Sequence, residues 1–526
     1  MTSSLYFWIA ALIYFTFVIW LGYYIWKRVK LDTETHQILD FWIAGRKFPG
    51  WRLAISVTAG WLMLGWLGYG MSMIYQMGLS GLWILPLPWF ILCFIIIWMV
   101  SYVRKFPAIS LPEAIQKRFG SSTRTIIALA SIFVFTSWTG AELFMVGKLG
   151  APFLQVPPAV VMIVVAIPIM IYTYFGGFRA VVMTDFVQFV LMAIFIAVLG
   201  LVSYFAAAET TGGHILETLA NTATPYYGEG SMFNLFACGI AMVIILLAAY
   251  LPGWMIEQDL LLRIQGANSL KEARKGAWYG LLLISVFVIG IPTLVAFFAV
   301  VLFPPELETS LAAIGADATG IISAIILKYF PIWGQVLMFA GLLAAQMSTV
   351  DTFANVIALP LTYDIARPTF LRKLPRKKEA QWSRILSVAA ILFGLIYALN
   401  ATSLMDVYIL SSGVLTASIA IPAFAMFWKR ANRLGVILSA ILGFLGNVWF
   451  YFYEYHIVQH AYSPRWLADT YLGYIMVGIL SSLIGLIAGS MFGSPPTREQ
   501  LATVSPQPLE GVDIFDIMRE AAMQKI

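Results

Sequence analysis

The chain has 526 residues, of which 61% are hydrophobic and 11% are charged, whereas soluble domains carry about 25% charged residues. Apolar runs of about 20 residues, each long enough to cross a bilayer, recur along the whole chain, so this composition excludes an ordinary soluble protein. The net charge of +6 does not indicate nucleic-acid binding, because the basic residues are spread over the loops between apolar runs. Cys93 and Cys238 both lie in apolar runs and predict neither a disulfide nor a metal site.

Taken in chain order, the apolar runs predict an all-α polytopic membrane protein with thirteen transmembrane helices. The predicted helices are 5–27, 51–77, 80–102, 124–148, 157–175, 178–207, 232–256, 276–303, 331–361, 382–401, 405–428, 433–455 and 470–492. No small-residue cleavage pattern follows the first run, so we expect a retained helix and not a signal peptide.

This series predicts six consecutive parts. They are a leading helix and cytoplasmic loop at 1–50, a first repeat of five helices at 51–207, an extracellular loop at 208–231, a second repeat of five helices at 232–430, two peripheral helices at 431–492 and a cytoplasmic tail at 493–526. Lys and Arg concentrate in alternate loops, and 208–231 contains neither. Because basic residues favour cytoplasmic loops, we expect a cell-membrane protein with its N-terminus outside and its C-terminus in the cytoplasm.

Two of the predicted helices carry residues that interrupt a helix. Helix 51–77 contains four glycines within ISVTAGWLMLGWLGYG, and helix 232–256 contains the adjacent pair Pro252 and Gly253. The two helices lie five spans apart, so they run in opposite directions. Interrupted helices at matching positions of two inverted halves predict a transporter binding site. The alternative is that the glycines serve close helix packing alone.

Helix 331–361 carries a polar stripe inside the membrane. Ser348, Asp351, Thr352 and Asn355 follow at spacings of three, four and seven residues, so they share one helical face. A carboxylate within a membrane span is costly and indicates function, and hydroxyl, carboxylate and backbone oxygens suit a hard cation. A stripe that only packs helices together would explain the hydroxyls but not Asp351.

These motifs resemble the sodium:solute symporter family, which includes bacterial sodium/proline, sodium/galactose, sialic acid and pantothenate carriers. The resemblance covers residues 5–490 and rests on four motifs in the family's order. They are SLPEAIQKRFG, YTYFGGFRAVVMTDFVQ, WMIEQDLLLRIQGANSLKEA and the MST-x-D pattern that ends at Asp351.

The resemblance implies a leucine-transporter-like fold with a 5+5 inverted-repeat core, and sodium as the coupling ion. It places a primary sodium site at the carbonyls of Ile55, Thr58 and Ala345 and the hydroxyls of Ser348 and Thr349. Some members have a second sodium site, whose matching residues here are Asp185, Ser348, Asp351 and Thr352.

The chain also departs from the family. Proline carriers have an aspartate where this chain has Val57, sugar carriers have polar residues at Trp61 and Leu62, and their gating tyrosine aligns with Gly253. Proline and sugar are therefore doubtful solutes. We expect an aromatic and apolar solute site, formed by Trp61, Gly65, Trp66, Tyr69, Glu142, Tyr250 and Trp254. Glu142 either faces this site and recognises an amine or hydroxyl group, or pairs with Lys148.

The predicted function is sodium-coupled symport of a small organic solute by alternating access, with the solute and the lipid bilayer as partners and no nucleic acid. Proton coupling through Asp185, Asp351 or Glu142 is one alternative, and a transporter-like membrane sensor is another. The chain has no Walker-type loop and no evident nucleophile–base pair, so neither direct ATP drive nor an enzyme is expected. Oligomeric state is not determined by the sequence.

Overall fold

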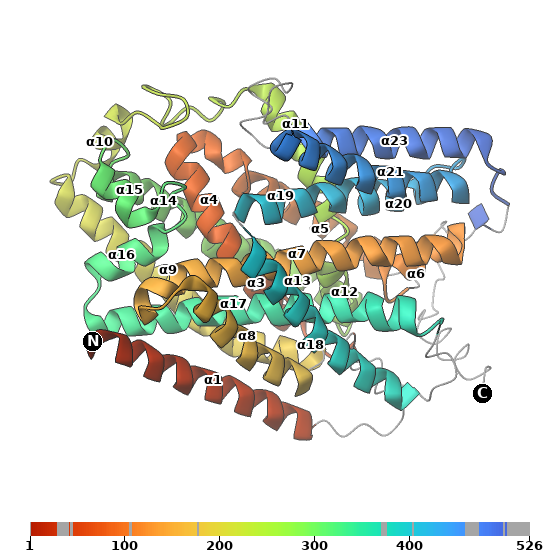
Figure 1. Ribbon diagram of the computed structural model, residues 1–526, viewed down its shortest axis with the longest axis horizontal. Coiled ribbons are helices and arrows are strands. Elements are labelled where there is room, and N and C mark those ends of the chain that lie inside the picture. Colours follow the sequence, from red (N-terminus) through yellow and green to blue (C-terminus); the bar gives the residue numbers. More distant parts are fainter. Residues whose placement is uncertain are drawn as a thin grey trace.

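The computed structural model of the chain describes residues 2–28, 42, 46–104, 108–175, 178–369, 376–401, 404–457, 473–497 and 500–501. These parts are helical, and among them β-pairing is limited to two isolated bridges. Several long helices run along the longest axis of the molecule (Figure 1). Most of the predicted tail at 493–526 lies outside the described residues.

The helices follow the predicted order. The first half contains α1 (Thr2–Arg28), α3 (Gly50–Trp61), α4 (Leu64–Met77), α5 (Pro86–Arg104), α6 (Leu111–Phe119), α7 (Ser121–Leu154), α8 (Pro158–Phe175), α9 (Phe178–Thr210) and α10 (Ile215–Asn221). The second half contains α11 (Ile240–Trp254), α12 (Gln258–Gly266), α13 (Leu270–Leu283), α14 (Ile291–Leu302), α15 (Glu308–Ile314), α16 (Ile321–Tyr329), α17 (Ile332–Leu359), α18 (Arg376–Asn400), α19 (Leu404–Val414), α20 (Ile421–Phe424), α21 (Arg433–Phe452) and α23 (Gly473–Phe492).

The number of membrane spans differs from the prediction. Among the described residues, 11 helical segments are long and apolar enough to cross a membrane, or 12 if the bent pair α11 and α12 counts as one span. The predicted number of thirteen is therefore not confirmed. One counted segment, Leu64–Arg104, has 41 residues and joins α4 to α5 through a 3₁₀ turn at Gly78–Trp83. At about 1.5 Å per residue it is about twice as long as one crossing requires.

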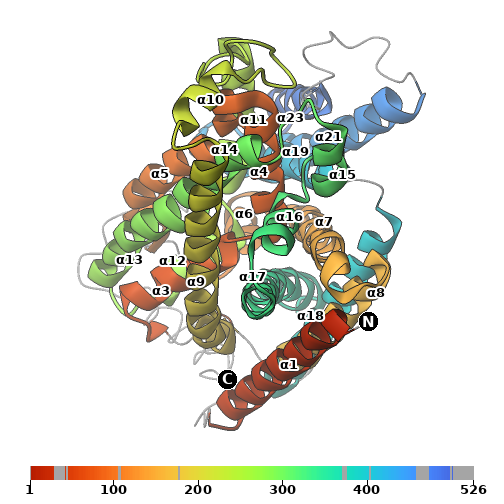
Figure 2. The same ribbon diagram turned by 90° about the vertical axis from the view of Figure 1, so that its left-hand side faces the viewer.

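Helix α17 lies at the centre of the bundle. In Figure 2 it is seen close to end-on, with α9 on one side and α7 and α8 on the other. It packs against α3, α7, α9 and α18. Every residue from Met338 to Leu359 except Ala340 is buried. Its polar stripe is therefore enclosed by protein and not by lipid, which is where membrane proteins place ionisable groups.

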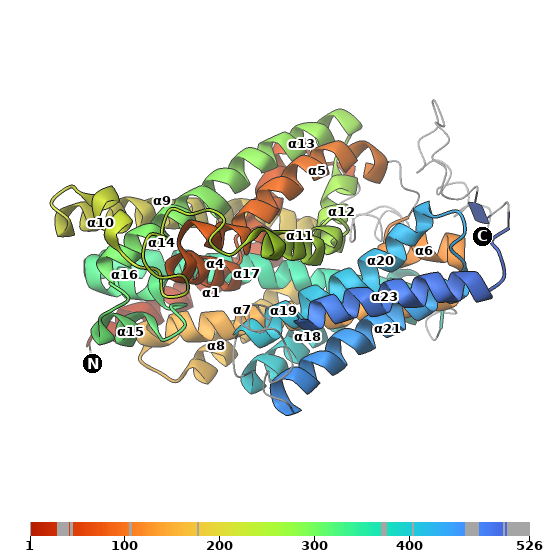
Figure 3. The same cartoon turned by 90° about the horizontal axis from the view of Figure 1, so that it is seen from above.

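The peripheral helices lie on the outside of this core. Helix α1 packs against α8 along one flank (Figure 1), and α21 and α23 lie side by side on another (Figure 3). Their outer faces carry large apolar side chains such as Leu12 and Phe492, which are 67% and 86% exposed. Such apolar exposure is expected of a surface that faces lipid.

Both predicted helix interruptions are present, but one is displaced. The first separates α3 from α4 at Leu62 and Met63, within the glycine-rich segment. The second was expected at Pro252 and Gly253, yet α11 continues through both residues to Trp254, and the chain bends by 49° into α12. The helix continues for two residues beyond the proline, and the amides of Met255 and Ile256 still donate to the carbonyls of Leu251 and Gly253.

Candidate functional site

The broken end of α3 meets the polar stripe of α17. A helix leaves its last four carbonyls without intrahelical partners, and α3 ends at Trp61, so the Gly60 carbonyl is free to face α17. The Thr349 hydroxyl lies 3.4 Å from the Gly60 oxygen and 3.2 Å from the Ala345 oxygen. Thr349 and Ala345 are fully buried. The contact thus gathers several oxygen donors away from water.

The other predicted sodium-site positions have different surroundings. The Thr58 hydroxyl donates to the Ala54 carbonyl at 2.8 Å, and the Thr58 carbonyl accepts the amide of Leu62. Ile55 is half-buried on α3. Gly60 was not predicted, although its place next to the interruption was the available signal. Ser348 lies beside Thr349 on α17 and donates to Asp185 at 2.6 Å.

A buried arginine occupies the region of the predicted second sodium site. We define the arginine cluster as Ser56, Asp185, Asp259, Arg263, Ser348 and Thr352. Arg263 on α12 lies 3.6 Å from Asp185 and 3.5 Å from Asp259, and its Nη2 donates to the Thr352 hydroxyl at 3.0 Å. Its Nε donates to Ser56 at 3.1 Å. Four helices, α3, α9, α12 and α17, are thereby joined through one side chain.

Asp351 lies on the same stripe, yet it does not join this cluster by a hydrogen bond. Asp351 is fully buried, and neither carboxylate oxygen accepts a hydrogen bond within the described part of the chain. Tyr172, on α8, donates its hydroxyl to the Met347 carbonyl at 2.9 Å. An unpartnered buried carboxylate is costly, so Asp351 is a place where a cation or proton would be stabilising.

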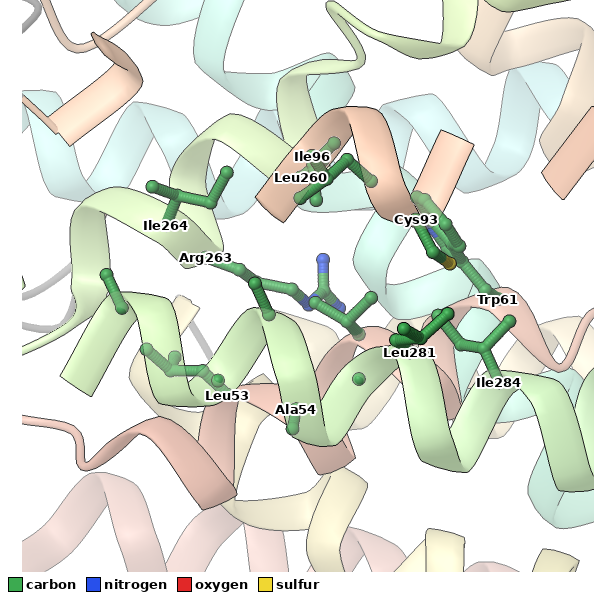
Figure 4. Close-up of a pocket in the computed structure, with 15 residues that line it drawn as sticks. Leu53, Ala54, Trp61, Cys93, Ile96, Leu260, Arg263, Ile264, Leu281 and Ile284 are labelled. Carbon is green, nitrogen blue, oxygen red and sulfur yellow. The ribbon is translucent and has the colours of Figure 1, made fainter. Parts of the chain in front are cut away.

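A small cavity adjoins the arginine cluster. It has a volume of about 40 Å³ and lies between α3, α5, α12 and α13. Figure 4 shows Arg263 extending from α12 into this space, with Trp61, Cys93 and Leu281 along its border. The volume suits a water molecule but not an organic solute, so the described conformation is closed at this point.

Six aromatic rings form a contiguous group between the two helix interruptions. We define the aromatic box as Trp61, Trp66, Trp89, Tyr250, Trp254 and Tyr408. Trp66 lies at its centre, with ring centroids 4.7 Å from Tyr408 and 5.9 Å from Trp89 and Trp254. Trp61 stacks on Trp89 at 5.9 Å, and Tyr250 stacks on Trp254 at 4.7 Å.

The predicted solute-site residues therefore come together. Trp61, Trp66, Tyr250 and Trp254 all belong to the box, and Tyr69 lies beside it, 6.2 Å from Trp66. The Trp61 indole also donates to Asp259 at 3.0 Å, which joins the box to the arginine cluster.

Glu142 lies against the box and not at the outer surface. It is fully buried on α7 and accepts hydrogen bonds from the Gly65 amide, at 3.1 Å, and from the Tyr408 hydroxyl. The alternative prediction, in which Glu142 pairs with Lys148, is wrong, because Lys148 forms its ion pair with Asp317 at 2.7 Å. The geometry favours Lys148 for this pair because it lies further along α7, at the half-exposed end near the α15–α16 loop.

Besides Gly60, sequence reasoning missed five residues of this region: Ser56, Trp89, Asp259, Arg263 and Tyr408. Asp259 and Arg263 did leave a signal, since an acid and a base four residues apart share a helical face. Trp89 and Tyr408 left none, because an aromatic residue in an apolar helix is ordinary.

Hydrogen bonds link the ends of the core on both sides of the box. On one side, the Asp317 backbone carbonyl accepts from Ser72 on α4, while its carboxylate binds Lys148. On the other, Gln258 on α12 bonds to the backbone of Leu111 and Ile109 next to α6. These links join distant segments of the core in the described conformation.

The chain resembles known membrane transporters over most of its length. The profile of the sodium:solute symporter family matches residues 41–443. Sodium/proline symporter 2 of Staphylococcus saprophyticus is 26% identical over 459 residues, covering 83% of this chain and 84% of the relative. The sodium/glucose cotransporter of Vibrio parahaemolyticus is 26% identical over 476 residues, covering 82% of each chain.

A solved structure supports the same fold. A sodium-coupled sialic acid symporter, in a substrate-bound outward-open state, matches with a TM-score of 0.71 at 18% identity, covering 94% of this chain and 98% of that chain. A nucleobase-cation-symport-1 family transporter in a closed conformation matches with a TM-score of 0.50 at 12% identity, covering 88% and 97%. The predicted all-helical, leucine-transporter-like fold is thus confirmed.

Proposed function

We propose a mechanism for a chain that belongs to the sodium:solute symporter family and therefore carries a small solute across the membrane together with sodium. It is a multi-pass membrane protein. In the proposed mechanism, sodium binds where the broken end of α3 meets α17, and the solute binds at the aromatic box.

One observation carries the sodium site: the Thr349 hydroxyl lies next to two backbone carbonyls, from Gly60 and Ala345, on facing helices. Sodium is a hard cation that prefers oxygen ligands. Carbonyls and hydroxyls supply such ligands without adding charge. We propose Gly60, Ala345, Ser348 and Thr349 as the site, with the predicted Ile55 and Thr58 carbonyls on the same helix as further candidates.

This position explains how sodium would be coupled to the solute. The ion would bridge α3 and α17, and the α3–α4 interruption that follows carries Trp61 and Trp66 of the aromatic box. Sodium that holds the α3 end against α17 also fixes two walls of the solute site. A ligand shifts a conformational equilibrium only through its different affinity for the two states, and this bridge exists only while α3 and α17 are in contact.

The second predicted sodium set stays a proposal. Two of its four members, Asp185 and Thr352, contact Arg263 in the described conformation. The guanidinium therefore supplies positive charge where a second sodium would lie. We propose that a second ion enters only in a conformation that withdraws Arg263.

The proposed orientation places the N-terminus outside, because the alternate loops that would then be cytoplasmic carry most of the basic residues. Sodium and solute would enter from the outer side, down the sodium gradient.

Proton coupling is a second candidate, and Asp351 favours it. A buried carboxylate whose oxygens accept no hydrogen bond from the described residues is stabilised by a proton as well as by a metal ion. Solute uptake into proteoliposomes separates the two. Uptake that needs outside sodium at fixed pH supports our proposal, whereas uptake driven by a pH gradient in sodium-free buffer contradicts it.

Thermal unfolding of the purified protein tests the sodium site before the solute is known. Sodium chloride should raise the melting temperature relative to equal potassium chloride, because a ligand that binds the folded state stabilises it. Ser348→Ala with Thr349→Ala should weaken sodium affinity by about 10- to 100-fold, since a hydrogen bond to a charged group contributes about 1.5–3 kcal/mol.

Ser203→Ala is the matched control. Ser203 is a buried hydroxyl on α9 that donates to the carbonyl four residues earlier, as Thr349 does, but it lies outside the site. The control should keep the full sodium response. An unchanged response in the double variant would place the sodium site elsewhere.

A further inference from the structure

Glu142 carries a buried carboxylate that the described chain does not neutralise. The side chain is fully buried, and no ion pair reaches it from any described residue. One oxygen, Oε1, accepts from the Gly65 amide and the Tyr408 hydroxyl, while Oε2 accepts no hydrogen bond within the described part of the chain. An ionised carboxylate away from water needs a positive partner.

A structural role accounts for one of the two carboxylate oxygens, Oε1. Gly65 is the second residue of α4, whose first amides have no intrahelical acceptors. Glu142 therefore caps the start of α4 from a neighbouring helix, and the partial positive charge at this helix end favours it. An amide side chain would make the same cap. The cap explains neither a full negative charge nor the unpartnered Oε2.

The aromatic box lies directly beside this carboxylate. Tyr408 contacts both, because its hydroxyl donates to Glu142 and its ring packs on Trp66 at 4.7 Å. Trp66 also follows Gly65 in the chain. A cation is attracted to the faces of aromatic rings, to tryptophan most strongly, and four of the six rings are tryptophans. The hydroxyl of Tyr250 in this box has no hydrogen-bond partner among the described residues.

We infer that the co-transported solute is an organic cation with an alkylammonium head group, which the aromatic box and the Glu142 carboxylate receive together. The inference rests on the proposed function. It goes beyond it by naming the charge and the chemical class of the solute.

The charge of the neighbouring groups distinguishes this class from a zwitterion. A solute with its own carboxylate requires a second, cationic partner. Within the described part of the chain, the basic group next to the box is Arg263, which borders the same cavity as Trp61. Arg263 already contacts Asp185 and Asp259, so two carboxylates share its charge. Among the residues that the structure describes, the site therefore offers a negative partner and no available positive one.

The rings now fill the space that the solute needs. A cavity beside Trp61, Trp66 and Trp89 has a volume of about 20 Å³, too small for an organic molecule. Trp61 and Trp66 flank the interruption between α3 and α4, and Tyr250 and Trp254 precede the bend between α11 and α12. A movement at these two interruptions would separate the rings and so open the box.

Ligand binding to the purified full chain tests the inference. The probes are choline and its uncharged analogue, in which a tert-butyl group replaces the trimethylammonium group, with proline and glucose as further probes. Binding is measured by calorimetry in sodium chloride. For the measurements without sodium, potassium chloride replaces sodium chloride. Choline should bind at least about tenfold more tightly than the uncharged analogue, because only the cation gains from the carboxylate and the ring faces.

Glu142→Gln and Trp254→Leu are the informative variants. The glutamine keeps an acceptor for the Gly65 amide, and its loss of charge should abolish the preference for choline while the sodium-induced rise in melting temperature remains. Trp254→Leu should weaken choline more than Trp254→Phe does. Trp138→Leu is the matched control, because Trp138 is equally buried but packs on Phe135 and Phe353. It should keep the choline preference.

The results that would overturn the inference differ from the result that would overturn the proposed function. Equal binding of choline and its uncharged analogue, an unchanged preference in Glu142→Gln, or tighter binding of proline or glucose overturns the inference. If Glu142→Gln does not fold, the graded Trp254 pair decides it. If sodium does not raise the melting temperature of the unmodified protein, the proposed function is instead overturned, so the two failures are distinguishable.

Discussion

The arginine cluster and the Glu142 site differ in how their charge is balanced. Both are buried, and both connect helices from the two halves of the chain. In the cluster, Arg263 contacts two carboxylates and two hydroxyls, and it ties α12 to α3, α9 and α17. At the other site, Glu142 faces aromatic rings and has no described cationic partner.

This difference separates closure from recognition. Arg263 is a cation of the chain itself, so it holds these helices together in every conformation in which its contacts form, with or without a bound ligand. A buried carboxylate without such a cation is stabilised by a cationic ligand or by a proton. In our proposal, the cluster stabilises the described conformation, whereas the Glu142 site binds the solute.

The largest expected effect comes from removing the internal cation. Arg263→Gln leaves Asp185 and Asp259 buried without their partner, and breaking a buried ion pair from one side costs about 3–5 kcal/mol. We expect a large fall in melting temperature, measured by thermal unfolding, and partial recovery in the double variant with Asp185→Asn. Arg274→Gln, which removes an exposed contact with Ser101, should change stability by less than about 0.5 kcal/mol. Equal melting temperatures for the two arginine variants would contradict the role of the cluster.

A smaller effect is expected at the link between Glu142 and the box. A Cβ on Gly65 would clash with the Tyr408 hydroxyl, so Gly65→Ala pushes this ring away and should cost about 1–3 kcal/mol. Solute binding should fall further than stability alone explains, as calorimetry would measure. Gly70→Ala is the matched control on the same helix, because a Cβ there meets nothing within 4 Å. Loss of solute binding in both variants would show that α4 tolerates no added methyl group, and that Tyr408 is not the cause.

The smallest effect is expected at the Lys148–Asp317 ion pair, which is partly exposed to water. The Asp317 carboxylate is desolvated, which raises its pKa, but hydrogen bonds and the charge of Lys148 outweigh this and hold the pKa below its usual value. The pair therefore stabilises the folded state above the unfolded pKa of about 4, and this contribution is lost as pH falls through the folded pKa. Since Asp317 is 54% exposed, solvent screening limits the contribution to about 0–1 kcal/mol.

Thermal unfolding of Asp317→Asn across this pH range measures the contribution. The difference from the unmodified protein should be small near neutral pH and disappear in acid. A difference that grows as pH falls would contradict the assigned direction of the pKa shift.

The sequence predicted those features that depend on local chemistry. Apolar runs predicted the helices, glycine and proline predicted the two interruptions, and the stripe ending at Asn355 predicted a polar face inside the bundle. The bend after Trp254 was misplaced by a few residues because amides beyond the proline still find helical acceptors.

The features that sequence reasoning missed depend on contacts between distant segments. Tyr408 meets Glu142 across 266 residues of chain, and Arg263 meets Thr352 across 89. No local spacing records such contacts. A long, flexible arginine side chain also reaches several helices, and only packing selects among them. For the same reason the prediction left the partner of Glu142 open between the pocket and Lys148.

Equilibrium binding of isotopic sodium to the purified protein tests most directly the claim that sodium and solute have separate sites. We predict saturable binding that Glu142→Gln leaves unchanged and that Ser348→Ala with Thr349→Ala weakens by about 10- to 100-fold. Sodium binding that survives the double hydroxyl variant, or that disappears in Glu142→Gln, would contradict the account.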